Sequence, residues 1–193
     1  MVGHAIIWMS LVPVKPLGTV STLGLTFAFC DCEVTAMDIR PIGLEHREAV
    51  NRVLKEEWNC PPSISRGRAI DTTVLPGFVS LDGRRINGAV TYLIDQGEWE
   101  IVTLNSFDEN KGIGTALIQA VLDVAKEAKC RRVWLITTND NAHAIRFYQK
   151  KGFEWVATHR NAMEVSRAMK PAIPLLGLDG IPLKHEIEFE IKQ

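Results

Sequence analysis

The segment 139–153, Asn-Asp-Asn-Ala-His-Ala-Ile-Arg-Phe-Tyr-Gln-Lys-Lys-Gly-Phe, is the stretch that decides the fold. It directly follows residues 133–137, a short apolar run that is typical of a buried strand. We expect a helix over residues 141–151, because a glycine such as Gly152 commonly follows the end of a helix. The run 153–158 then predicts another strand. A strand, a helix and a second strand are thus expected in direct succession.

Upstream of this segment, the chain alternates between strand and helix periods. Apolar residues at helical spacing predict a helix over 44–58, and the spacing becomes helical again from Gly112. Further strands are predicted at 38–42, 77–81, 86–94, 98–105 and 185–192. For the polar stretch 63–75 we expect irregular chain with a short helix. This order predicts the α/β class, with one mixed sheet flanked by helices.

The composition is that of an ordinary globular domain. The chain has 193 residues, of which 46% are hydrophobic and 23% charged, and its net charge is −1. A balance so close to neutral argues against nucleic acid or an acidic membrane surface as a partner. The four cysteines lack the spacing of a zinc site or a redox pair, so we expect no metal, and free thiols in a reducing cytoplasm.

The two ends of the chain depart from this regular pattern. Residues 1–36 contain few ionisable side chains but fit neither a spanning helix nor a secretory signal. We therefore expect an N-terminal extension outside the domain, with Met37 as the natural start and the domain at 37–193. Within it, residues 161–184 form an insertion in which a short helical piece, Ala162–Met169, leads into a Pro/Gly-rich loop.

A glycine-containing loop, 109–115, joins a predicted strand to a predicted helix. The amides of Gly112, Ile113, Gly114 and Thr115 would begin that helix without internal acceptors, and the helix dipole adds positive charge there. Glycines let a diphosphate approach closely, so the loop predicts an anion cradle; a tight turn that binds nothing is the alternative. The motif of nucleotide triphosphate loops is absent, and the dinucleotide pattern fails because Leu117 takes its last position.

Together, the two motifs resemble the GNAT superfamily of N-acetyltransferases. Residues 139–153 resemble its N-x-x-A-x-x-F-Y-x-x-x-G-F pattern, and the loop resembles its [RQ]-x-x-G-x-[GA] signature. The resemblance covers about residues 38–160 and the last strand. It implies the acyl-CoA N-acyltransferase fold, with a mostly antiparallel sheet, and acetyl-CoA as the acyl donor. Glu109 replaces the usual Arg or Gln, so we expect its side chain to turn away and Lys111 to supply positive charge.

The resemblance also implies where the donor lies. Its pantetheine arm would pair with the strand edge at Val102, Leu104 and Asn105, whose amides would polarise the thioester carbonyl. Asn139 and Asn141 would bond the pantetheine amides or cap the following helix, and Ala142 belongs to the same binding segment.

Two side chains are candidates for proton transfer. Glu98 and Glu100 share one face of a strand, and Trp99 between them points to the other face, toward the core. Glu100 is our preferred general base and Glu98 the second choice; solvated surface carboxylates are the alternative. The resemblance places Tyr148 beside the donor as the acid that protonates the leaving thiolate, and its alternative role is that of an aromatic anchor.

The expected reaction is transfer of an acetyl group to a primary amine by direct attack on the thioester. A non-catalytic acetyl-CoA sensor or interaction domain is the alternative, and a dehydrogenase is a distant third. The expected partner is a small-molecule or peptide amine, with a homodimer as an option and with no nucleic acid and no membrane. No residue selects the acceptor; we expect residues 59–75 and 161–184 to line its pocket.

Overall fold

The computed structural model of the chain describes residues 37–58, 61–108 and 110–193. The predicted extension 1–36 and the expected orientation of Glu109 lie outside the described residues. No helix in the described part is both long enough and apolar enough to cross a membrane.

The described residues form one seven-stranded sheet in the order β1-β4-β5-β6-β7-β9-β8. These strands are β1 (Asp38–Pro41), β4 (Gly77–Asp82), β5 (Arg85–Asp95), β6 (Glu98–Ser106), β7 (Arg132–Thr138), β9 (Glu186–Lys192) and β8 (Glu154–His159). Only β6 and β7 are parallel neighbours, because helix α2 (Ile113–Glu127) returns the chain between them. The other neighbouring pairs are antiparallel, so the mixed, mostly antiparallel α/β sheet is confirmed.

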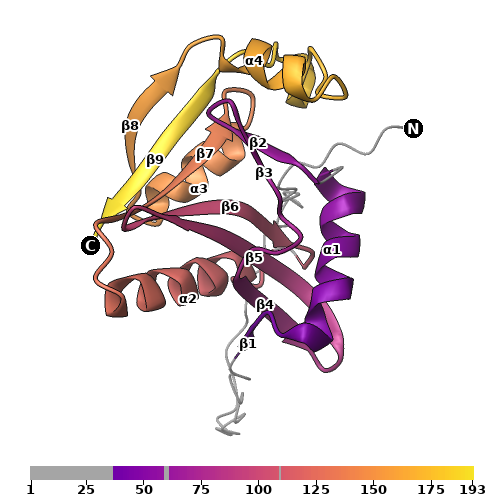
Figure 1. The fold of residues 1–193 in the computed structure, drawn as a ribbon, viewed down its shortest axis with the longest axis vertical. Helices are drawn as coiled ribbons and strands as arrows, with labels where there is room; N and C mark the ends of the chain where they lie inside the picture. Colours follow the sequence, from indigo (N-terminus) through magenta and orange to yellow (C-terminus); the bar gives the residue numbers. More distant parts are fainter. Residues whose placement is uncertain (1–36, 59–60, 109) are drawn as a thin grey trace, which may run out of the picture.

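Helices pack on both faces of this sheet (Figure 1). The larger core cluster lies under α2 and α3 (Ala142–Lys150) and includes Phe78 and Val90. The smaller cluster lies under α1 (Leu44–Trp58), where Val50 and Leu54 pack with residues of β4 and β5. Because adjacent strand residues point to opposite faces, the two clusters are the two sides of the same strands.

Where α1 ends, a small hairpin continues the cover of its face. It consists of β2 (Ser63–Ser65) and β3 (Arg68–Ile70), joined by a two-residue turn at Arg66 and Gly67. The short helix expected within 63–75 is therefore wrong. Strands of three residues are too short to show a period of two, so the alternation that reveals longer strands is missing here.

The insertion 161–184 begins with α4 (Ala162–Met169), as predicted. The loop that follows contains a short 3₁₀ helix, Leu178–Gly180, and a bridge between Leu176 and Pro182. Asp140 holds this loop, because its carboxylate accepts a 2.8 Å hydrogen bond from the amide of Leu178. A Cβ at Gly177 would lie 1.9 Å from the same carboxylate, so the approach requires glycine there.

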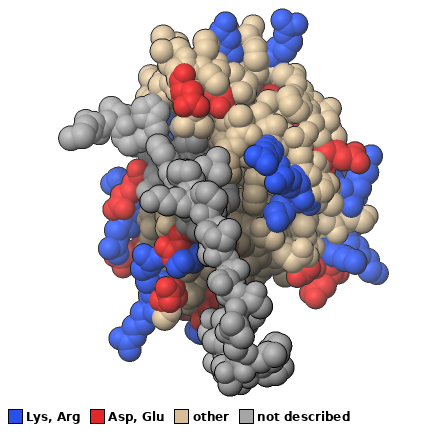
Figure 2. Space-filling model, turned by 180° about the vertical axis from the view of Figure 1, so that it is seen from behind, with Lys and Arg blue, Asp and Glu red and all other residues tan. Residues whose placement is uncertain are grey.

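Surface charge is mixed rather than concentrated. On the side of the molecule opposite to that of Figure 1, basic and acidic side chains are interspersed among uncharged ones (Figure 2). This distribution agrees with the net charge of −1.

Candidate active site

Strands β6 and β7 run side by side for a few residues and then part. Glu98 to Ile101 of β6 pair with Arg132 to Leu135 of β7. Beyond Leu135, β7 pairs with β9 alone, and beyond Ile101, β6 pairs with β5 alone among the described strands. The parting leaves a β6 edge from Val102 onward that an extended ligand can join as an added strand.

A β-bulge at Val102 marks the point of parting. On β5, Thr91 pairs with Thr103 and the next residue, Tyr92, pairs with Ile101, so Val102 is the extra residue. The bulge also resets the alternation, since Ile101 and Leu104 both enter the larger core cluster. Leu104 therefore offers a ligand only its backbone. Val102, Leu104 and Asn105, our predicted pantetheine segment, lie on this edge.

The glycine loop leads into the N-terminus of α2. Gly112 precedes the helix with a φ of 77°, and no side chain caps it. The first helical bond runs from the amide of Ala116 to the carbonyl of Gly112. The amides of Ile113, Gly114 and Thr115 thus come before the first helical acceptor and suit an anion.

Protein packing does not explain the glycine at 114. A Cβ built there would lie 3.5 Å from the ring of Phe147, an ordinary contact, and its φ is not in the left-handed region. Close approach of a ligand is the remaining physical reason for a glycine at this position. Lys111 belongs to the same loop, directly before Gly112, and is ion-paired with Asp108 at 3.4 Å.

Two asparagines just before helix α3 make hydrogen bonds within the protein. The side chain of Asn141 caps the helix, accepting a 2.9 Å bond from the amide of Ala144. That of Asn139 holds the loop before β9, accepting from Lys184 and His185 and donating to Pro182. Ala142 is exposed at the first position of the helix. Contacts of these three residues with a donor remain predictions.

Tyr148 lies inside the larger core cluster. Its ring packs against Phe147, Phe153 and Phe189, with centroids 5.4 to 6.0 Å away. The aromatic-anchor role therefore exists, whether or not the hydroxyl also donates a proton. Burial raises the pKa of Tyr148 above its ordinary value, so the phenol is protonated at neutral pH.

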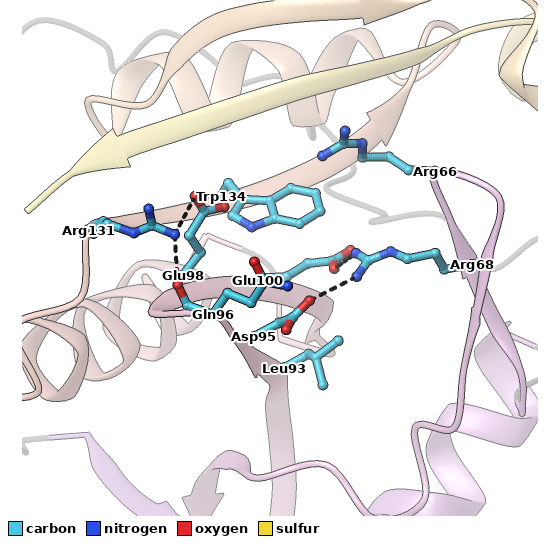
Figure 3. A pocket seen from close by; sticks show the side chains of 9 residues that line it. All are labelled: Arg66, Arg68, Leu93, Asp95, Gln96, Glu98, Glu100, Arg131 and Trp134. Carbon is cyan, nitrogen blue, oxygen red and sulfur yellow. Dashed lines mark hydrogen bonds and ion pairs between the residues drawn. The ribbon is translucent and has the colours of Figure 1, made fainter.

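Glu100 is a buried carboxylate at the base of a pocket (Figure 3). Its two oxygens accept 2.5 Å hydrogen bonds from the hydroxyl of Ser65 and the guanidinium of Arg68. Burial raises the pKa of Glu100, while these two groups lower it and offset only part of the effect. The alternative of a solvated surface carboxylate is wrong for Glu100. Trp99 is buried against Tyr92 on the other face, as predicted.

The pocket encloses about 170 Å³ on the face of the sheet that the hairpin covers. Its lining residues come from the hairpin, β5, the β5–β6 turn, β6, and β7 with the residue before it: Arg66, Arg68, Leu93, Asp95, Gln96, Glu98, Glu100, Arg131 and Trp134. Glu98 shares this pocket and pairs with Arg131 and Arg132. The segment 59–75 was expected to line the acceptor pocket, but the sequence did not single out Arg66 or Arg68 within it.

The floor beside the pocket is a buried charged network. Arg132 donates to Glu98, Glu188 and Glu190 at 2.7 to 2.8 Å, and Glu188 also pairs with His159. Among the described residues, no group of three or more His, Cys, Asp and Glu side chains is arranged to hold a metal ion.

Comparison with known proteins gives a family match and similar relatives. Residues 45–153 match the model of the acetyltransferase (GNAT) family. Two Bacillus subtilis proteins are similar: YdhI is 44% identical over 69% of this chain and 84% of its own. YxbD is 37% identical over 78% of this chain and 96% of its own.

A solved structure shows the same fold. A GNAT family acetyltransferase from Elizabethkingia anophelis, with acetyl-CoA bound, superposes with a TM-score of 0.60 at 17% identity. The match covers 81% of this chain and 98% of that one. With the family model spanning more than half of its length, the chain belongs to the acetyltransferase (GNAT) family.

Proposed function

We propose that the protein transfers the acetyl group of acetyl-CoA to a primary amine by direct attack of the amine on the thioester. The observation that carries the proposal is the position of Glu100. This residue has a buried carboxylate and lies opposite Trp134 of β7, one residue before the last pair, Ile101 with Leu135, at which β6 and β7 part. A base and a strand-shaped gap therefore lie next to each other.

The residues present fit the donor. The β6 edge from Val102 to Asn105 would hold the pantetheine arm through its backbone, and the amides of Ile113, Gly114 and Thr115 would hold the diphosphate. The absence of a side chain at Gly114 agrees with a close ligand, as does the donor bound to the similar Elizabethkingia protein. The donor, once bound, supplies a thioester carbonyl that accepts the amine's electron pair.

Glu100 would take up the proton that the amine loses. An alkylammonium has a pKa of about 10.4 and must lose a proton before it can attack. A carboxylate whose pKa is raised by burial is a better base near neutral pH than an ordinary glutamate. Ser65 and Arg68 fix the orientation of this carboxylate. Tyr148, protonated at neutral pH, would donate a proton to the departing sulfur.

The test is turnover of acetyl-CoA with a panel of amines, read as thiol release and as the mass of the acetylated product. We expect release that depends on the amine and on folded protein. The alternative hypothesis, a sensor, predicts a different result. The protein would bind acetyl-CoA in calorimetry, but none of the amines would raise thiol release above the rate of spontaneous hydrolysis.

A further inference from the structure

The pocket beside Glu100 contains as many basic as acidic side chains. Three arginines, Arg66, Arg68 and Arg131, share it with Asp95, Glu98 and Glu100. Two of the arginines are already engaged with acidic lining residues: Arg68 with Glu100 and Asp95, and Arg131 with Glu98. The third is not.

Arg66 presents the least engaged charge in the pocket. Its guanidinium lies over the ring of Trp134, 5.4 Å from the centroid, and reaches toward the pocket in Figure 3. Its one ion pair among the described residues is with Glu188 at 3.7 Å, longer than a hydrogen bond. Glu188 is satisfied without it, because Arg132 and His159 both bond to that carboxylate at 2.8 Å. The five N–H donors of Arg66 thus suit a planar anion.

The backbone at Arg66 is a second, independent observation. Arg66 and Gly67 are the two central residues of the hairpin turn, with φ of 49° and 70°. Positive φ at both positions is typical of a type I′ turn, which favours Asn or Gly at the first position. An arginine is strained there, so turn geometry does not account for its side chain.

Resting on the proposed function, we propose that the acceptor is a small amine that carries a carboxylate, such as an amino acid. Its carboxylate binds the guanidinium of Arg66, and its amine lies toward Glu100. Arg66 and Arg68 flank the same indole ring, at 5.4 and 5.7 Å, and Arg68 bonds to Glu100. Both guanidinium groups therefore lie against the same ring, so the carboxylate and the amine of one small acceptor can bind at the two of them together.

The size and charge of the pocket favour this class over others. A pocket of about 170 Å³ can admit the reacting end of a small molecule. A diamine or polyamine would bring a second positive charge to a site where the one weakly engaged side chain is also positive. A carboxylate instead gives Arg66 a hydrogen-bonded partner of opposite charge and can form a bidentate pair with it.

The first experiment compares α- and ω-amino acids with their matching carboxamides, together with diamines and aminoalkylphosphonates. The carboxamide of an α-amino acid loses its ammonium proton more readily, so intrinsic reactivity favours the amide. We expect kcat/KM to be ~10-fold or more higher for the acid, because a hydrogen bond to a charged group contributes that much. Phosphonates that exceed the carboxylates would identify a different anion and overturn the carboxylate assignment.

The second experiment uses Arg66→Asn, chosen because asparagine suits the turn. We expect a melting temperature equal to or above that of the native protein, with the preference for acid over amide lost mainly through KM. Arg52→Asn is the matched control, because Arg52 lies on the exposed face of α1 and its one ion pair among the described residues is with Glu48 at 3.9 Å. It should keep the native preference.

Besides the phosphonate result, three outcomes overturn the proposal. Amides or diamines are better acceptors than the acids, or Arg66→Asn folds and keeps the preference, or Arg52→Asn loses it equally. If none of the amines tested supports thiol release, the proposed function fails separately. Calorimetry of the CoA-bound protein with N-acetyl amino acids then still tests the pocket: we expect binding that Arg66→Asn weakens ~10-fold, and no binding refutes it.

Discussion

At the scale of single residues, Glu100 combines two features that rarely coincide on a strand. Its side chain is 3% exposed, yet it has two strong hydrogen-bond donors, Ser65 and Arg68, from another part of the chain. Burial disfavours the ionised form, and the donors favour it. The result is a carboxylate that is held in one orientation and whose pKa is shifted toward neutral pH.

Glu100→Gln should lower acetyl transfer most strongly between the pKa of Glu100 and that of the amine, where the amine is protonated and native Glu100 can still accept its proton. A raised pKa means that native activity falls, as pH decreases, at a higher pH than for an ordinary glutamate. The measurement is kcat/KM against pH for both proteins, and we expect at least ~10-fold loss near neutral pH, narrowing as pH rises. Glu98→Gln is the matched control. An equal loss of kcat/KM at every pH would mean that Glu100 acts on binding or structure. A larger loss in Glu98→Gln than in Glu100→Gln would identify Glu98 as the base.

Tyr148→Phe should slow the chemical step while leaving acetyl-CoA affinity nearly unchanged. The phenylalanine ring keeps the packing against Phe147, Phe153 and Phe189 but has no proton to donate. We expect a loss of at least ~10-fold in single-turnover rate, at the cautious end for general acid catalysis. An unchanged single-turnover rate would leave Tyr148 as a packing residue alone.

The sequence predicts individual residues well where local periodicity places them. The alternation of Glu98, Trp99 and Glu100 correctly separated the pocket face from the core face. The partners of Glu100 could not be predicted, because Ser65 and Arg68 are more than thirty positions away along the chain. Hydrogen bonds of that separation depend on how the hairpin packs, and no local pattern encodes it.

At the scale of elements, the start of α2 and the bulge in β6 together form the proposed donor site. One supplies amides without helical acceptors, and the other turns a strand edge away from its neighbour. Both features are backbone geometry, so the side chains around them are free to vary. Glycine at 114 is the exception, since the approach of a ligand depends on the absence of a side chain.

Gly114→Val should weaken acetyl-CoA binding by ~10-fold or more without unfolding the protein, because its branches occupy the space in front of the helix amides. The Cβ itself meets only an ordinary contact with Phe147. Calorimetry with acetyl-CoA measures the affinity. Gln119→Val, an exposed site on the same helix, controls for the lower helix propensity of valine and should bind normally. Unchanged affinity in folded Gly114→Val would contradict the anion-cradle assignment.

Elements with a clear period were predicted, and those without one were not. The β5, β6 and β9 strands and helices α1 and α2 each repeat their pattern several times. The β2–β3 hairpin has only three residues in each strand, too few to show a period. The bulge at Val102 is itself a break in the alternation, so no periodic pattern predicts it. The mostly antiparallel pairing followed from the family resemblance, and the order of strands in the sheet is seen only in the structure.

At the scale of the whole molecule, the two faces of the sheet at β9 differ in kind. Ile187 and Phe189 enter the apolar core, while Glu186, Glu188 and Glu190 are buried on the opposite face among polar partners. The sequence shows the alternation but not the burial, because three glutamates on one face are usually solvated. Arg132 forms ion pairs with Glu188 and Glu190, and also with Glu98. This network forms the floor behind the proposed acceptor pocket.

Arg132→Met should destabilise the protein in a pH-dependent way. Burial alone would raise the pKa of Glu188, but bonds from His159 and Arg132 outweigh it, so the pKa is lowered. Such a group contributes stability above the ordinary glutamate value of about 4.3 and loses it as pH falls through the lowered value. At neutral pH we expect a loss of about 3 kcal/mol in the free energy of unfolding, the lower end for a broken buried pair, because 21% of the Arg132 side chain is exposed.

The difference in unfolding free energy between native protein and Arg132→Met should shrink below the ordinary glutamate pKa, as the carboxylates that have lost Arg132 become protonated. Denaturant unfolding between neutral and acid pH measures it, and Arg52→Met, which removes a solvated pair, should change stability by only about 0–1 kcal/mol. A deficit that stays constant with pH would mean that Arg132 contributes through its contact with Trp134 rather than through its ion pairs.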